Sequence, residues 1–119
     1  MRKKNYKGRC EKRKLSKCVD VCKTYDAIQY AYADVLEADN DIIEIRCNVQ
    51  LEGLEFTSDF VCLKANGEYM VRECVYRRLL TKPRTMKLLE CSRNYWMVTK
   101  NITDWGLVID EEKSFVNQK

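Results

Sequence analysis

Two acidic residues stand inside apolar, strand-like segments and are the strongest candidates for chemistry. Asp59 lies within Thr57-Ser58-Asp59-Phe60-Val61, and Glu73 lies within residues 70–75. Acidic residues are depleted from strand interiors, which favours a role for both. If the two segments pair around an Asn66-Gly67 turn, the numbers of paired residues sum to about 133. Asp59 then lies opposite residue 74, with Glu73 as a near neighbour.

Two neighbouring carboxylates could bind one hard divalent cation. Mg²⁺ prefers a few carboxylates together with waters and substrate phosphate, and Mn²⁺ takes similar oxygen ligands. The alternative is that each acid pairs with a nearby arginine or faces water at a sheet edge. Spacing alone leaves both interpretations open.

The seven cysteines form a second candidate set. Four of them could supply thiolates to a zinc ion: Cys10, Cys18, Cys22 and Cys47. Their spacings lack the usual C-x₂-C pair, so zinc is not the expected cofactor. Small buried thiols are the simpler interpretation of the cysteines that fall in apparent core elements, which are Cys47, Cys62, Cys74 and Cys91.

The chain contains no histidine. This excludes Ser-His and Cys-His nucleophilic pairs, histidine-based zinc sites and imidazole acid–base chemistry. No apolar stretch reaches the roughly 20 residues of a membrane span, and the basic N-terminus lacks the apolar segment of a signal peptide. We therefore expect a cytoplasmic protein with reduced cysteines and no membrane partner.

The elements that must position these residues alternate between helix and strand. A helix is predicted over residues 25–38, capped by Thr24 or Asp26, with Ile28, Tyr32, Val35 and Leu36 on its apolar face. Strands are predicted from residue 42 to 49, from 55 to 64 and from 68 to 76. Lys82-Pro83 opens a second helix that runs to about residue 98, and residues 104–109 form a final strand.

One sheet with helices packed on it is the natural way to bury these apolar faces. We therefore predict a single α/β domain over residues 24–112, with the order helix, strand, two-stranded hairpin, helix, strand. A basic N-terminal arm (residues 1–23) precedes it, and a polar tail (residues 113–119) follows it.

Charge is concentrated in the arm. Residues 1–23 carry ten Lys or Arg and two acidic residues, a net charge of +8, whereas the rest of the chain is net −4. Such an arm is suited to contact with nucleic-acid phosphates; a solubilising tail is the alternative. The candidate DNA contacts are Arg2, Lys3, Lys4, Lys7, Arg9, Lys12, Arg13 and Lys14, with Arg77 and Arg78 after the hairpin.

Three segments resemble a known nuclease family. They are residues 39–46, the Thr57-Ser58-Asp59-Phe60 segment and residues 88–109. In order and spacing they resemble the PD-(D/E)XK nuclease core, and most closely the N-terminal catalytic domain of TnsA, the endonuclease subunit of heteromeric transposases. Ser58 replaces the proline of that family's T-P-D-F motif. The resemblance covers roughly residues 24–112.

The resemblance implies a specific site. In that family a helix Glu, the motif Asp and a Gln or Glu hold a divalent metal, and a Lys two residues later helps to activate water for phosphodiester hydrolysis. Asp59 matches the motif Asp, and Glu73 matches the E of E-x-K. The Lys position falls on Val75 and the helix Glu position falls on Gln29, which could instead form a capping box with Asp26.

With half of the site replaced, the resemblance implies a TnsA-like mobile-element protein. It would bind DNA, a transposase-type partner, or both, with weak or lost nuclease activity. The alternative is an active Mg²⁺- or Mn²⁺-dependent endonuclease with a rearranged site, in which Lys64 or Arg77 supplies the missing cation. A third interpretation is an adaptor or inhibitor that acts by protein–protein contact.

Overall fold

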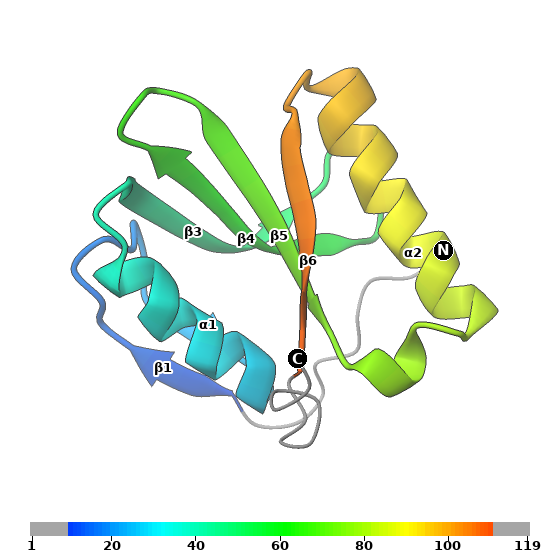
Figure 1. Ribbon diagram of the computed structural model, residues 1–119, viewed down its shortest axis with the longest axis horizontal. Coiled ribbons are helices and arrows are strands. Elements are labelled where there is room, and N and C mark those ends of the chain that lie inside the picture. The colour runs from blue at the N-terminus through cyan, green and yellow to red at the C-terminus, as the bar shows by residue number, and fades with distance from the viewer. Residues whose placement is uncertain (1–9, 111–119) are drawn as a thin grey trace, which may run out of the picture.

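The computed structural model describes residues 10–110, which form a small α/β protein. It contains two α-helices, a mixed four-stranded sheet and a β-hairpin, together with two short helical turns (Figure 1). In chain order the elements are β1 (Glu11–Arg13), β2 (Cys22–Thr24), α1 (Ala27–Ala38), β3 (Ile42–Gln50), β4 (Thr57–Lys64), β5 (Tyr69–Val75), η1 (Arg77–Leu79), α2 (Pro83–Asn94), η2 (Tyr95–Thr99) and β6 (Asp104–Ile109). From α1 onward the predicted order of helices and strands is confirmed.

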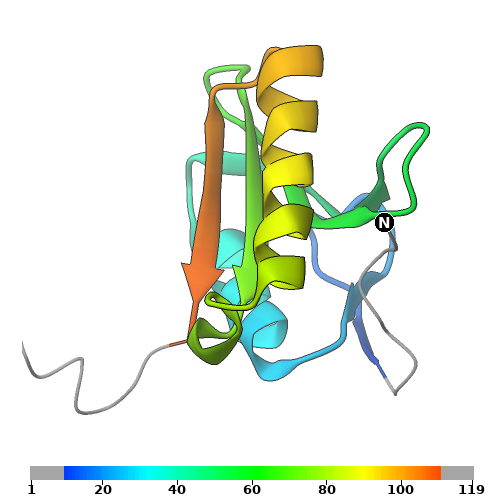
Figure 2. The ribbon, with the colours of Figure 1, turned by 90° about the vertical axis from the view of Figure 1, so that its right-hand side faces the viewer.

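The sheet has the strand order β3-β4-β5-β6. The pairs β3/β4 and β4/β5 are antiparallel, whereas β5 and β6 are parallel. Parallel neighbours need a crossover connection, and η1, α2 and η2 supply it. Figure 2 shows α2 running beside the strands that it connects.

Apolar residues fill both faces of the sheet. Alternation along β4 sends Phe60 and Cys62 to one side and Val61 to the other. The first side packs against α1 through residues such as Ile28 and Leu36. The second side packs against α2 and η2, where the buried members are Leu51, Phe56, Val61, Val71 and Trp96. A sheet buried on both faces explains why its central strands are apolar almost throughout.

Helix α1 begins two residues later than predicted, with Asp26 as its N-cap. The Asp26 carboxylate accepts a 2.9 Å hydrogen bond from the backbone N–H of Gln29. The predicted apolar face is partly wrong, because Val35 is 56% exposed. Each helical residue turns by about 100°. The buried residues Ile28, Gln29, Ala33 and Leu36 therefore define a face centred near Leu36, and Val35 is turned about 100° away from that centre.

The turn between β4 and β5 differs from the predicted one. Gly67 has a φ of 91°, but Asn66 is not among the residues with positive φ. The Gly67 N–H donates to the Lys64 carbonyl (2.9 Å), and the Lys64 N–H donates to the Glu68 carbonyl (2.8 Å). These bonds define a three-residue loop that ends in a left-handed glycine, rather than a two-residue loop with positive φ at both positions.

This turn shifts the pairing of β4 with β5 by one residue relative to the predicted register. Phe60 pairs with Arg72, and Leu63 pairs with Tyr69. Carried one step further, the same register sets Asp59 opposite Glu73, and not opposite residue 74 as predicted. Directly opposed residues point to the same face of a sheet, so the two carboxylates share a face.

The segment before α1 is folded from residue 10 onward, although it falls in the predicted arm. β1 and β2 pair antiparallel, with Arg13 opposite Cys22. The chain between them adds to the outer edge of β3: the Ile45 N–H donates to the Lys17 carbonyl (2.8 Å), and the Val19 N–H donates to the Ile45 carbonyl (3.1 Å). The remainder of the arm and the polar tail lie outside the described residues.

The second helix begins at Pro83, as predicted, with proline in its first turn. Its α-helical part ends at Asn94, and the π-helical turn η2 carries it to Thr99, close to the predicted limit. Within residues 10–110, neither helix has the length and apolar character needed to cross a membrane.

Replacing Gly67 with alanine tests the turn. An added Cβ meets no atom within 4 Å, so the effect comes from the left-handed backbone alone. We expect Gly67→Ala to lower the free energy of unfolding by about 1–2 kcal/mol in urea denaturation. Gly106→Ala is the matched control, because Gly106 has no positive φ and the atom nearest to its added Cβ, Arg72 Nη1, is 3.4 Å away, which is an ordinary contact. An equal loss of stability in both variants would contradict the assignment of the turn.

Candidate functional site

The residues that the family resemblance singles out come together in the interior. Gln29 on α1, Asp59 on β4 and Glu73 on β5 are each at most 2% exposed. The Gln29 Nε2 donates to Asp59 Oδ1 at 3.1 Å. The Gln29 Oε1 accepts from the backbone N–H of Tyr25 at 2.8 Å, which holds the amide in this orientation. The same glutamine therefore completes the N-terminal cap of α1 and contacts the carboxylate.

The two carboxylates occupy the point where β4 and β5 stop pairing. The ladder between these strands ends at Phe60 and Arg72. Beyond it, the backbone N–H of Asp59 donates to Glu73 Oε1 (3.1 Å), and the backbone N–H of Cys74 donates to Asp59 Oδ2 (2.7 Å). Each acidic side chain thus accepts a hydrogen bond from the backbone of the opposite strand, in place of a carbonyl group.

Helix α2 and strand β6 supply the remaining contacts. The Ser92 hydroxyl donates to Glu73 Oε2 at 2.6 Å, and the Trp105 indole N–H donates to Ser92 Oγ at 3.0 Å. The Trp96 indole N–H donates to Ser58 Oγ at 2.8 Å, and the two serine oxygens lie 3.5 Å apart. This group of side chains, which we call the serine–tryptophan network, links α2, β4 and β6 to the carboxylate pair.

The serine–tryptophan network is not indicated by the sequence pattern. Ser92 and Trp96 are four residues apart in a helical segment, so their common face was foreseeable. Their connection to Asp59 and Glu73 was not, because it requires the crossover that lays α2 against β5. Ser58, identified only as a replacement for proline, is an internal hydrogen-bond acceptor for Trp96.

The geometry limits what the carboxylates can do chemically. All four of their oxygens accept a hydrogen bond from the protein. A catalytic Mg²⁺ also needs room for waters and for a substrate phosphate. Asp59 and Glu73 are 2% and 0% exposed, and Val75, at the position of the family's lysine, is 7% exposed. Metal binding by this pair would require the surrounding side chains to move.

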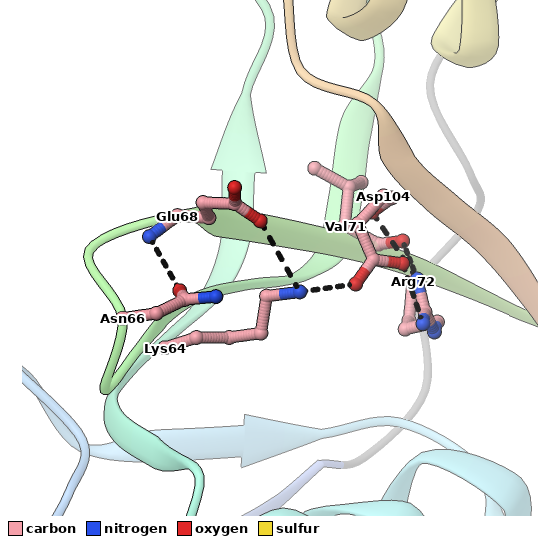
Figure 3. Close-up of polar contacts among 6 residues, drawn as sticks. All are labelled: Lys64, Asn66, Glu68, Val71, Arg72 and Asp104. Carbon is pink, nitrogen blue, oxygen red and sulfur yellow. Dashed lines mark hydrogen bonds and ion pairs between the residues drawn. The ribbon is translucent and has the colours of Figure 1, made fainter.

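Of the two cations considered as substitutes, Lys64 lies away from the acidic site. The Lys64 ammonium contacts Asp104 at 2.7 Å and Glu68 at 3.9 Å, beside the β4–β5 turn (Figure 3). It is five residues from Asp59 along β4, or about 17 Å at the usual rise of a strand. Arg77 follows β5 in η1, and its backbone N–H donates to the Asp110 carboxylate.

Asp104 joins the ends of β4, β5 and β6 through ion pairs. Its carboxylate contacts Lys64 and also the Arg72 guanidinium, at 2.8 Å. Partial burial alone would raise the pKa of Asp104, but the hydrogen bonds and positive charges of Lys64 and Arg72 outweigh it and lower the pKa overall. Arg72 is therefore engaged in the sheet, and not in the acidic site.

The candidate DNA contacts separate into three groups. Arg2, Lys3, Lys4, Lys7 and Arg9 lie outside the described residues. Lys12 and Lys14 are exposed beside β1, whereas Arg13 contacts Asp34 at 2.7 Å and lies 3.6 Å from the centre of the Tyr30 ring. Arg77 and Arg78 lie in η1, at the end of the strand that carries Glu73.

The cysteines divide in a way that their spacing did not indicate. Cys18, Cys22 and Cys47 form a cluster in which every pair of sulfur atoms lies within 4.8 Å. Cys10 lies instead beside Tyr25, whose pKa is raised by burial and, less strongly, by Cys10. Cys62 is a buried core thiol, and burial raises its pKa to about 12. Three of the four cysteines considered for zinc therefore lie together.

A serine-to-alanine change tests the serine–tryptophan network. Ser92→Ala removes the donor to Glu73 and the acceptor for Trp105, both in the interior. We expect the free energy of unfolding to fall by about 1–3 kcal/mol, measured in urea. Asn94→Ala on the exposed side of the same helix should change it by less than about 0.5 kcal/mol. If both substitutions changed the free energy of unfolding equally, the hydrogen bonds of Ser92 would not contribute measurably to stability.

Comparisons with known proteins place this chain in no family. Neither protein-family models nor curated protein sequences match it. The likeness to TnsA therefore rests on the residues named above, and the site itself is a buried carboxylate pair held by Gln29 and Ser92.

Proposed function

We propose that this chain is a TnsA-like mobile-element protein that binds DNA, alone or with a transposase-type partner, and cleaves it weakly or not at all. Its fold would be that of the PD-(D/E)XK nucleases. The helix–three strands–helix–strand order and the mixed sheet are consistent with that core.

One observation carries the proposal: the Asp59 and Glu73 carboxylates meet Gln29 but are directed into the protein. Their meeting is what a nuclease ancestry predicts for these positions. Their four hydrogen-bonded oxygens and near-zero exposure favour a structural role in the present chain. Gln29 can donate to a carboxylate, whereas a glutamate there would add a third negative charge that needs a metal.

The surface charge supports contact with a polyanion. η1 and α2, with the residues between them, carry six basic side chains and only Glu90 as an acid; the basic residues are Arg77, Arg78, Lys82, Arg84, Lys87 and Arg93. Among the ion pairs of residues 10–110, none involves Lys82, Arg84, Lys87 or Arg93. Positive charge that the protein does not neutralise is available to phosphates. The N-terminal residues 1–23 carry ten further basic side chains in the sequence.

An active endonuclease is the second candidate, because the same convergence of Gln29, Asp59 and Glu73 favours it. It would require the carboxylates to exchange protein donors for a metal ion when DNA binds. It would also work without a lysine at position 75, with metal-bound water as the nucleophile. An assay for DNA cleavage distinguishes the active endonuclease from a DNA-binding protein that cleaves weakly or not at all.

Supercoiled plasmid incubated with the full chain and Mg²⁺ or Mn²⁺ tests this proposal. We expect no nicking above the level of Asp59→Asn and Glu73→Gln, which keep the shapes of the buried side chains. Metal-dependent nicking by the wild type that both variants lose would establish the endonuclease and overturn the proposal.

DNA binding is measured in parallel by fluorescence anisotropy over a range of salt concentrations. We expect binding to weaken with salt, and the slope of log K against log salt to become shallower by about 0.9 for each phosphate that the variant no longer neutralises. Removal of residues 1–9, or Arg77→Gln with Arg78→Gln, should have this effect. Arg46→Gln is the control, because Glu44 already pairs with Arg46. If the chain neither binds nor cleaves DNA, a role in binding a protein partner would be favoured instead.

Replacing Gln29 with glutamate tests whether Gln29, Asp59 and Glu73 together can still bind a metal ion. Gln29→Glu replaces the donor to Asp59 Oδ1 with a third carboxylate. We expect the midpoint of thermal unfolding to fall without divalent metal and to recover in part with Mn²⁺, because a cation would relieve the repulsion. Ala31→Glu, which adds the same charge at an exposed position of the same helix, should show neither effect. A Gln29→Glu protein that is destabilised equally with and without Mn²⁺ would argue against a latent metal site.

A further inference from the structure

Three cysteines from separate segments converge at the edge of the sheet. Cys18 lies in the chain between β1 and β2, Cys22 begins β2, and Cys47 lies on β3. The sulfur atoms of Cys22 and Cys47 are 3.5 Å apart, and all three sulfurs lie within 4.8 Å of one another. Cys22 is fully buried, and the other two are partly exposed.

These distances suit a shared metal ion. Zinc–sulfur bonds of about 2.3 Å in a tetrahedral arrangement set neighbouring sulfurs about 3.8 Å apart. The thiol cluster therefore needs only small side-chain movements to close on one ion. A disulfide between Cys22 and Cys47 would need the sulfurs to approach to about 2.05 Å, and would leave the third thiol without a role.

The backbone holds the three ligands in place independently of a metal. The bonds that join Lys17 and Val19 to Ile45 fix Cys18 beside β3. The Asn48 side-chain amide donates to the Lys23 carbonyl at 2.9 Å, which fixes β2 beside the same strand. Because Ile45 and Cys47 are two residues apart in one strand, their side chains point to the same face, toward Cys22. The ligand positions are thus set by the fold.

The cluster also lies where the N-terminal hairpin meets the main sheet. β1 and β2 are three residues each and belong to a separate two-stranded sheet. Isolated two-stranded hairpins are marginally stable in water. A metal bound to β2, β3 and the chain before β2 would join this hairpin to the main sheet, as structural zinc does in small domains.

We propose that Cys18, Cys22 and Cys47 bind one Zn²⁺ ion as thiolates, with water as the fourth ligand, and that this ion fastens the N-terminal hairpin to β3. Thiolates are soft ligands that select zinc over Mg²⁺ and Mn²⁺. The proposed site therefore differs in chemistry from the Asp59–Glu73 pair and does not rest on the proposed function. Cys10 is not a ligand, because it is absent from the cluster.

The experiment uses the full reduced chain, freed of metal and titrated with Co²⁺ and then Zn²⁺. We expect one equivalent of Co²⁺ to give a thiolate-to-cobalt charge-transfer band in the near ultraviolet, which one equivalent of Zn²⁺ abolishes. Alkylation of the native protein with and without zinc, mapped by mass spectrometry, should show zinc-dependent protection at Cys18, Cys22 and Cys47. Neither readout depends on a variant that must fold.

Single cysteine-to-serine substitutions identify which thiols bind the zinc ion. Cys18→Ser and Cys47→Ser should each weaken zinc binding by at least about 10-fold, since even changes outside the ligand shell commonly have that effect. Cys10→Ser and Cys91→Ser should bind zinc as the wild type does. Absence of the cobalt band, a Cys22–Cys47 disulfide that forms in the presence of zinc, or equally weakened binding in Cys10→Ser would each overturn the proposal.

Discussion

The burial of two carboxyl groups between neighbouring strands is the constraint on which much of this structure depends. A carboxyl group in the interior without hydrogen-bond donors costs several kcal/mol, so each oxygen must meet a donor. The donors come from four elements: α1 through Gln29, β4 and β5 through their own backbones, and α2 through Ser92. Any displacement of these elements would leave a buried oxygen unsatisfied, and the pair therefore acts as a common point of attachment.

The arrangement also separates the closeness of two carboxylates from the other requirements of a catalytic metal site. A catalytic metal site needs carboxylates that are close together and open to a substrate, and in the nuclease family that the chain resembles a lysine also helps to activate the water. Asp59 and Glu73 satisfy only the first condition, because α2 covers them and Val75 offers no proton-transfer group. Amide, hydroxyl and backbone N–H donors contact the carboxylate oxygens instead. Such a network is stable by itself, whereas a half-filled metal site would not be.

The fold keeps two different sets of potential ligands apart. The carboxylates contact α2 and the serine–tryptophan network, whereas the thiol cluster adjoins the core between the sheet and α1. Oxygen and sulfur donors favour different metals, so the two sets differ in the ion that each could bind. The segment from residue 10 to residue 24 belongs to the thiol side, and it is part of the folded body.

Local patterns along the chain are sufficient to predict the elements and the candidate pair, but the way in which they meet depends on long-range packing. Periodicity predicted both helices and all four strands of the main sheet, because apolar spacing reports directly on local burial. It could not settle the hairpin register: Asn66-Gly67 is compatible with a two- or a three-residue loop, and one residue moves Glu73 to the other face of its strand. Nor could it join Ser92 to Glu73 or Cys18 to Cys47. Those contacts link residues 19 and 29 positions apart, and only the packing of the helix and the N-terminal hairpin against the sheet brings them together.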